Sequence, residues 1–192
     1  KMVELPDSIT FIGEDVFYDC YNLTNIYYVG SEEQWYEIEQ GYNDFSGAEI
    51  HFSSTMPAPY PVPGGGIFFD SETGTVIGYV GNISELNIPA EIDGVPVVAI
   101  SKAAFLDCDS LTAITFPDSL ESIGSYAFGR CHGLSVLTIP NGVTTIDSYA
   151  FHWCSNLKMV EIPDSVTFIG EDVFYNCYNL TNIYYVGSEE QW

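Results

Sequence analysis

The sequence has few basic residues and no long apolar run. Only 4 Lys and Arg stand against 27 Asp and Glu, which gives the 192 residues a formal net charge of -23. Such an excess repels nucleic-acid phosphates and anionic lipid headgroups, although it could attract basic partners. No run approaches the roughly 20 apolar residues that a membrane-spanning helix needs. We therefore expect no nucleic acid binding and no membrane insertion, and interpret the charge as a solvated acidic face.

The five cysteines and three histidines lack the patterns of chemical sites. No C-x-x-C spacing occurs and no histidine recurs beside a cysteine, so a zinc site is not expected. A disulfide between stacked segments stays an alternative, but side chains that point the same way fit its geometry poorly. No nucleophile motif accompanies His51, His132 or His152. We expect a protein that is not an enzyme and needs no cofactor.

Self-similarity is the strongest signal that is present. Cys108, Cys131, Cys154 and Cys177 are separated by 23 residues each, and the residues around them recur in step. The shared unit is L-x-x-I-x-I-P-x-x-V-x-x-I-x-x-x-A-F-x-x-C-x-x. A fixed period of this length is typical of a solenoid, in which each repeat forms one coil of the chain.

Each part of the unit predicts a local structure. The alternating apolar residues of L-x-x-I-x-I predict a half-buried strand, which proline ends because it lacks a hydrogen-bond donor. V-x-x-I predicts a second short strand, and A-F-x-x-C predicts a short helix or 3₁₀ turn whose Phe and Cys plug the coil. One coil cannot bury its apolar side alone, so the coils must stack and form ladders of Leu, Ile, Phe and buried Cys.

This unit strongly resembles the BspA-like leucine-rich repeats of bacterial surface and secreted proteins, through its I-P-x-x-V-x-x-I and A-F-x-x-C elements. The resemblance covers residues 86–192 and 1–35. It implies an α/β fold, a leucine-rich-repeat solenoid of 23-residue coils. It also implies an extracellular or cell-wall-associated module that binds or adheres to an extracellular or host surface protein, without catalytic activity.

A longer duplication organises the chain. Residues 1–35 and 158–192 are identical at 32 of 35 positions, and Cys20 corresponds to Cys177. In the first copy, Ser31-Glu-Glu-Gln34 predicts a capped helix with Trp35 and Ile38 on one face. Residues 48–52 predict a final strand that covers the last coil. The three differences between the copies are Leu5/Ile162, Ile9/Val166 and Asp19/Asn176.

The composition divides the chain into three segments. We expect residues 1–55 to be the C-terminal end of one repeat block with its cap, and residues 56–66 to be an extended Pro/Gly linker. Residues 67–192 form a second block, with an opening hairpin at 67–85 and repeats at 86–192. Because the chain starts and stops inside repeats, we expect a piece of a longer protein whose uncapped ends could make head-to-tail contacts.

The outward side of the first strand of each coil is the candidate binding surface, because its residues should form columns across the stack. Tyr27 and Tyr28 of the first copy add aromatic area of the kind favoured in protein and sugar recognition. The alternatives are a structural spacer in a larger wall-associated protein and a carbohydrate-binding surface. The candidate residues are Thr115, Thr138, Met159, Glu161, Asn182, Tyr184 and Tyr185.

Overall fold

The computed structural model describes residues 1–20, 23–43, 45 and 47–187 and divides the chain into two compact units. Unit 1 is Lys1–Ala58 and unit 2 is Pro59–Trp192. Residues 188–192, the end of the expected repeats 86–192, lie outside the described residues. No helix among the described residues is long and apolar enough to cross a membrane.

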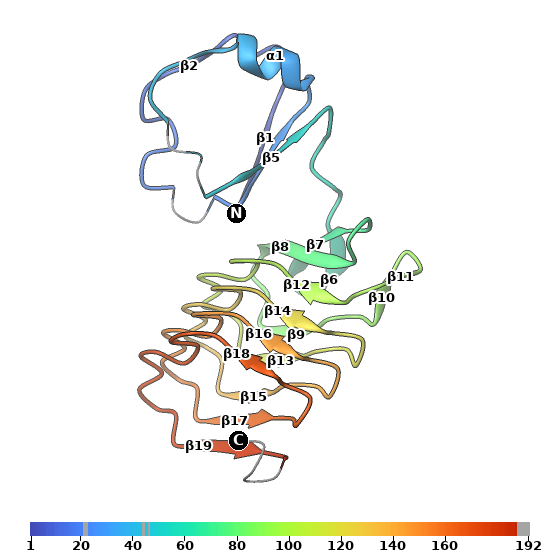
Figure 1. Ribbon diagram of the computed structural model, residues 1–192, viewed down its shortest axis with the longest axis vertical. Coiled ribbons are helices and arrows are strands. Elements are labelled where there is room, and N and C mark those ends of the chain that lie inside the picture. Colours follow the sequence, from blue (N-terminus) through green and yellow to red (C-terminus); the bar gives the residue numbers. More distant parts are fainter. Residues whose placement is uncertain (21–22, 44, 46, 188–192) are drawn as a thin grey trace. The chain divides into compact units, whose positions relative to one another are not determined.

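Unit 2 is a β-solenoid of 23-residue coils in which the second strand of each coil joins one long sheet (Figure 1). Its strands follow the order β18-β16-β14-β12-β8-β7-β6, and neighbours from β8 to β18 are parallel. Ile100, Ile123, Ile146 and Ile169 are in register along it. The strands are β6 (Tyr60–Val62), β7 (Gly65–Asp70), β8 (Thr75–Gly81), β12 (Ala99–Ile100), β14 (Ser122–Ile123), β16 (Thr145–Ile146) and β18 (Phe168–Ile169).

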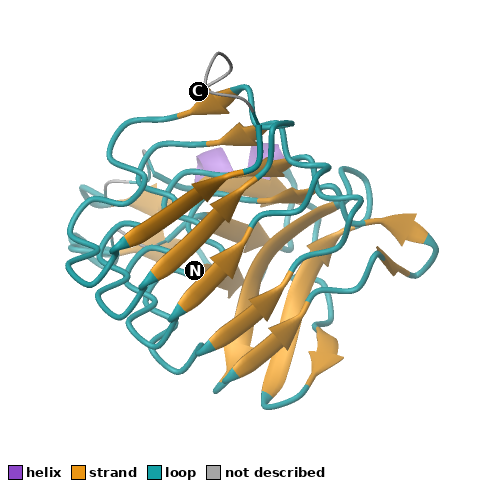
Figure 2. Cartoon of the chain, turned by 90° about the horizontal axis from the view of Figure 1, so that it is seen from below, coloured by secondary structure: helices purple, strands orange, loops and turns teal. Residues whose placement is uncertain are grey.

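The first strand of each coil lies in two shorter parallel sheets. Figure 2 shows how strands of successive coils lie side by side. One pairs β9 (Glu85–Asn87) with β13 (Ala113–Thr115). The other has the order β15-β17-β19, formed by Val136–Thr138, Met159–Ile162 and Asn182–Tyr185. A small antiparallel pair, β10 (Glu91–Ile92) and β11 (Val95–Pro96), extends the first coil.

Ladders of identical side chains fill the inside of the stack, as the repeat predicts. The rings of Phe105, Phe128 and Phe151 are fully buried and stack in sequence, with centroids 5.0 Å and 5.3 Å apart. Cys131 and Cys154 are also fully buried. Because every coil adds the same inward residues, the core is one continuous cluster that runs along unit 2.

The A-F-x-x-C segments are turns, which corrects the expectation of a helix or 3₁₀ turn in each coil. Their backbone N–H groups alternate between partners: Ala104 donates to Ser101 within the coil, whereas Phe105 donates to Ala127 of the next coil. The residue before the A-F pair (V-F in the last coil) and the residue before the cysteine have a left-handed φ, between 54° and 64°, and such residues interrupt a right-handed helix. In unit 2 these residues are Ala103, Asp107, Tyr126, Arg130, Tyr149, Trp153, Asp172 and Asn176.

The segment that opens unit 2 is a hairpin of β7 and β8. The carboxylate of Asp70 shapes its turn by accepting bonds from Glu72 N (2.9 Å) and Thr73 Oγ1 (2.6 Å). Residues 60–62, within the segment 56–66 expected to be a linker, pair with residues 65–67 and belong to the same sheet. This pairing gives part of the proline-rich segment a fixed register.

Unit 1 contains a coil like those of unit 2, followed by a cap. Its parallel strands β1 (Met2–Leu5), β3 (Asn25–Tyr28) and β5 (Glu49–Phe52) form one sheet, and β2 (Phe11–Ile12) pairs with β4 (Glu39–Gln40). The helix α1 (Glu32–Glu37) begins at Ser31 with the expected capping box. Trp35 and Ile38 are buried, at 4% and 7% exposure. The expected helix and final strand of the cap are therefore both formed.

Candidate functional site

The sheet β15-β17-β19 brings five of the seven candidate residues together. Parallel pairing aligns Met159 with Asn182 and continues this column to Val136. A second column aligns Thr138, Glu161 and Tyr184. Between the columns, Leu137 and Val160 are fully buried, whereas Ile183 on β19 is 46% exposed. Alternation along each strand thus gives an outward face with Val136, Met159 and Asn182 in one column and Thr138, Glu161 and Tyr184 in the other.

Exposure on this face is uneven. Val136 is 44% exposed and Tyr184 54% exposed, whereas Met159 and Glu161 are half-buried. Val136 and Tyr184 are therefore the two places on this outward face where apolar side-chain surface is accessible. Met159 lies between Val136 and Asn182 in the same column. A partner that covered this face would contact a rigid, hydrogen-bonded surface.

Thr115 lies on the neighbouring strand β13, and Tyr185 lies on β19 but faces the core. Thr115 is exposed, but its strand β13 is paired with β9 and belongs to the other short sheet. Tyr185 is half-buried and packs against the core of unit 2. Its register partner is the buried Ile162, so the alternation of the strand already places Tyr185 on the inward side. The two-residue period was the sequence signal for this position.

The two candidate tyrosines of unit 1, Tyr27 and Tyr28, are not accessible. Tyr27 and Tyr28 are 5% and 1% exposed. The ring of Tyr27 stacks on His51 of β5 at 4.5 Å, and Tyr28 makes an edge contact with Trp35 of α1 at 5.3 Å. Rings covered in this way cannot act as platforms for sugars, so Tyr27 and Tyr28 give the carbohydrate alternative no support.

The cysteines of unit 2 form a ladder of packing groups. The Sγ atoms of Cys131 and Cys154 donate to the carbonyl oxygens of Phe105 and Phe128 in the preceding coils, at 3.3 and 3.2 Å. Burial raises the pKa of the Cys131 thiol well above its usual value. Because the thiolate is the reactive form, such a group is a poor nucleophile. This agrees with a structural role for the ladder.

Cys20 differs from this ladder. Its thiol is exposed, although the equivalent Cys177 of unit 2 is only 7% exposed, so the expectation that Cys20 is buried is wrong. Cys177 donates to the carbonyl oxygen of Phe151 in the preceding coil. A hollow of about 280 Å³ lies beside Cys20, lined by Phe17, Tyr42 and Asn43 among others.

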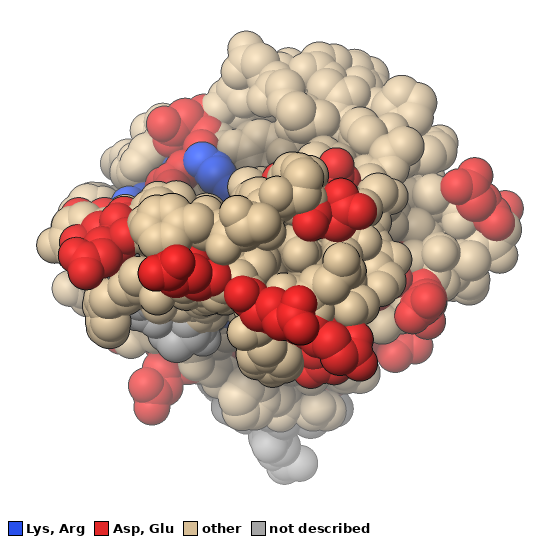
Figure 3. All heavy atoms as spheres, turned by 90° about the horizontal axis from the view of Figure 1, so that it is seen from above, with Lys and Arg blue, Asp and Glu red and all other residues tan. Residues whose placement is uncertain are grey.

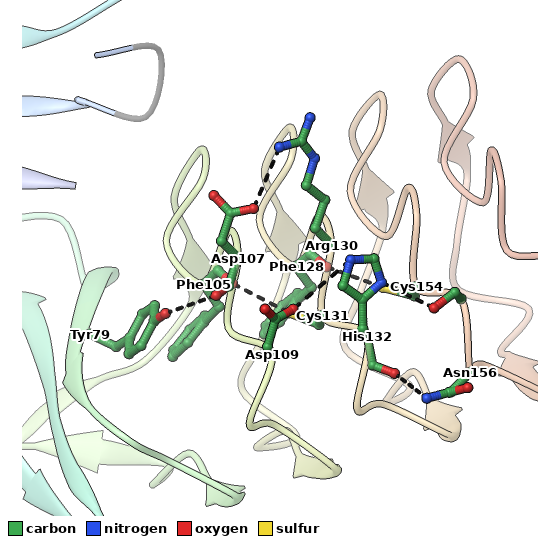
Figure 4. A network of polar contacts seen from close by, with 11 residues as sticks. Tyr79, Phe105, Asp107, Asp109, Phe128, Arg130, Cys131, His132, Cys154 and Asn156 are labelled. Atoms are coloured by element: carbon green, nitrogen blue, oxygen red, sulfur yellow. Dashed lines mark hydrogen bonds and ion pairs between the residues drawn. The ribbon is translucent and has the colours of Figure 1, made fainter. Parts of the chain in front are cut away.

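Polar contacts join the turns of neighbouring coils (Figure 4). The Arg130 guanidinium lies 3.7 Å from the Asp107 carboxylate. The side-chain nitrogen of Asn156 donates to the carbonyl oxygen of His132 at 2.7 Å, and Asn179 repeats this bond to Ser155 one coil further on. Since each contact links one coil to the next, the network stabilises the stacking.

The same network contains a serine, a histidine and an aspartate in line. His132 Nδ1 lies 3.1 Å from Ser155 Oγ, and His132 Nε2 lies 4.0 Å from Asp109. In a hydrolase triad the carboxylate is buried and hydrogen-bonded to the ring. Here the Asp109 side chain is 71% exposed and His132 is 42% exposed, so water has access to both. The alignment follows from equivalent positions in successive coils and lacks the buried, hydrogen-bonded carboxylate of a hydrolase triad.

His152 is a buried histidine in the turn of its coil. Its side chain occupies the space above Gly129, where a Cβ atom would overlap its ring. The ring contacts Tyr126 and Tyr149 edge-on, and Nδ1 lies 3.1 Å from the Tyr149 carbonyl oxygen. It is 8% exposed, and burial lowers its pKa. Gly129, which has no side chain, was the sequence signal for the space that the His152 ring fills.

Acidic side chains dominate the charged surface, as Figure 3 shows for one face. Four basic residues cannot neutralise 27 acidic ones, so most carboxylates are solvated. No group of three His, Cys, Asp or Glu among the described residues is arranged to hold a metal ion. The surface therefore favours contact with neutral or basic partners.

Known proteins share this repeat and its architecture. The family model described as "BspA type Leucine rich repeat region" matches in six copies, over residues 1–51 and 78–191. No curated protein matches the chain. Among solved structures, a leucine-rich repeat protein from Bacteroides capillosus is 28% identical, covers 68% of this chain and 100% of that one, and superposes with a TM-score of 0.57.

Two further structures show the same fold. A leucine rich cell surface protein from Faecalibacterium prausnitzii is 22% identical with a TM-score of 0.57, and the match covers 100% of this chain but 61% of that one. The chain thus spans less than two thirds of that protein. The leucine-rich repeat protein of T. pallidum is 26% identical with a TM-score of 0.52, over 66% of this chain and 71% of that one.

Proposed function

Because the chain belongs to the BspA-type leucine-rich repeat family, we propose that it is a cell-surface or secreted module that binds a protein through the strand face of unit 2. The observation that carries the proposal is the pair of outward columns on β15-β17-β19. The Faecalibacterium protein of the same fold is described as a cell surface protein, which supports an extracellular location. The proposed activity is adhesion, without chemistry of its own.

The chemistry of the face suits a protein partner. Tyr and Met are enriched in protein interfaces, and Tyr184 and Met159 lie in adjacent columns of this sheet. The backbone is held by parallel hydrogen bonds on both sides of β17, so little conformational entropy is lost when the face is covered. Glu161 and the net charge of -23 favour a partner with a basic rim.

The test is capture of extracellular-matrix and cell-surface proteins on the immobilised chain, compared with a Met159→Asp, Tyr184→Ala variant. We expect a protein that the chain captures and that the variant retains at least about tenfold less, since aromatic anchors carry roughly 2 kcal/mol or more of binding energy. Tyr178→Ala is the matched control, because Tyr178 is 70% exposed and lies in a turn.

The result of this capture experiment distinguishes an adhesion module from a structural spacer. Thermal melting of each variant confirms that the fold is kept, which matters because Met159 is half-buried. The proposal would be contradicted if no protein were captured, or if the chain and the strand-face variant captured it equally. Either result would support a structural spacer, in which the outward side chains only keep the sheet soluble in water.

A further inference from the structure

The turn at Asn141 and Gly142 departs from the repeat in the middle of unit 2. After the proline that ends the first strand, successive coils carry Asp118-Ser119, Asn141-Gly142 and Asp164-Ser165. The hydroxyl groups of Ser119 and Ser165 each donate to a carbonyl oxygen of the preceding coil at 2.8 Å. Glycine has no hydroxyl, so the turn of the middle coil lacks the side-chain bond that ties the neighbouring turns to the stack.

Asn141 is exposed and Gly142 is half-buried in a turn that Val143 N closes by donating to the Pro140 carbonyl oxygen at 3.1 Å. Neither the side-chain amide of Asn141 nor the N–H of Gly142 has a hydrogen-bond partner among the described residues. Because glycine has no Cβ, no side chain hinders the approach of its nitrogen to the side-chain carbonyl carbon of Asn141. A succinimide ring forms from this pair of groups when both are unbonded.

Asn156 provides the contrast within the same unit. It is also exposed, but its side-chain nitrogen donates to the His132 carbonyl oxygen at 2.7 Å. The backbone nitrogen that follows it belongs to the buried Leu157 and donates to the Cys154 carbonyl oxygen at 3.0 Å. Ring closure there requires both bonds to break, whereas no bond to a described residue holds the two groups at Asn141. Of the asparagines in the sequence, Asn141 alone is followed by glycine.

We propose that Asn141 is a site of spontaneous covalent modification, at which the folded chain converts this asparagine to aspartate and isoaspartate. The backbone nitrogen of Gly142 loses its proton to water and bonds to the side-chain carbonyl carbon of Asn141. The bond from that carbon to Nδ2 breaks, and ammonia leaves. Water then opens the succinimide at either of its two carbonyl groups. One opening gives aspartate, and the other gives isoaspartate, in which the backbone runs through the former side chain.

Both products alter this coil. Each adds a negative charge to the formal net charge of -23, at a position where both neighbouring coils already carry aspartate. Like charges in successive coils repel one another, which weakens the stacking. Isoaspartate also lengthens the backbone of a turn in which a Cβ atom at Gly142 would already contact the carbonyl oxygens of Asp118 and Leu120. We therefore expect the modified chain to open more readily at this coil.

The experiment incubates the whole chain at neutral pH in water enriched in heavy oxygen and follows every asparagine by peptide mapping and mass spectrometry. We expect Asn141 to exchange its amide for a carboxyl group that carries heavy oxygen. Its conversion should be at least about tenfold faster than that of Asn156, where two hydrogen bonds add to the barrier. Gly142→Ser, which copies the neighbouring coils, should slow conversion of Asn141 at least about tenfold and leave Asn156 unchanged.

Thermal melting of the fresh Gly142→Ser chain confirms that the fold is kept before the time course begins. Conversion of Asn141 that is absent, or no faster than that of Asn156, would overturn the proposal. Aspartate without isoaspartate at this position, or a rate that Gly142→Ser leaves unchanged, would also overturn it, because direct hydrolysis would then remove the amide without the backbone nitrogen. The site is independent of the proposed strand-face function, since its readout is chemical and involves none of the candidate binding residues.

Discussion

His152 and Gly129 show how single residues make one coil fit the next. The imidazole is buried over the glycine and against the rings of Tyr126 and Tyr149. Burial disfavours its charged form and lowers its pKa. A side chain at position 129 would have to displace this ring, so the two positions depend on each other.

This contact predicts a pH dependence of stability. The folded state favours the neutral ring, so the contribution is complete above the usual histidine pKa of about 6.5 and is lost as the pH falls below it. We expect urea unfolding to show a larger loss of stability between pH 7.5 and 5.5 in the native chain than in His152→Phe. Equal losses in both proteins would mean that the ring protonates freely in the folded state. Gly129→Ala should reduce the free energy of unfolding by about 1–3 kcal/mol at pH 7.5.

At the scale of elements, the turns as well as the strands hold the coils together. Each A-F-x-x-C turn donates alternate backbone N–H groups to the next coil and inserts a phenylalanine into the ring ladder. Phe128 lies between two other rings, at 5.0 and 5.3 Å. Phe174 is half-buried and its centroid is 5.9 Å from that of Phe151.

The ladder predicts a gradient of mutational cost. Phe128→Ala should lower the free energy of unfolding by about 3–5 kcal/mol, because it leaves a cavity between two coils. Phe174→Ala should cost less, since its ring is partly solvated already. Denaturant unfolding of unit 2, followed by far-UV circular dichroism, gives both values. Equal costs for the two substitutions would argue against a continuous stacked core.

At the scale of the whole molecule, charge acts against folding. With 27 acidic and 4 basic residues, the folded chain repels itself, and salt screens this repulsion. We expect the thermal midpoint to rise between 10 and 200 mM NaCl and then to level off, because the Debye length is then below about 10 Å. A control with the same concentrations of sucrose has no screening effect. A midpoint that falls with salt would show that attractive ion pairs dominate instead.

The repeat itself follows from the sequence alone. Apolar residues that recur every 23 positions can be buried only if coils stack, so the inward places of Ile123, Phe128 and Cys131 are set by their spacing. The capping box at Ser31 is also local, and it begins α1 as expected. The helix expected in each coil does not form, because half of its N–H groups bond to the next coil and no local pattern describes that neighbour.

Tyr27 and Tyr184 mark the limit of what local sequence determines. The residues next to them in the sequence are identical, yet Tyr27 is buried beneath His51 and Tyr184 is 54% exposed. The sequence determined the period, the strands and the inward ladders, because these depend on alternation and spacing within one coil. Only the tertiary structure decided which strand covers a coil, because burial depends on the segment that packs beside it.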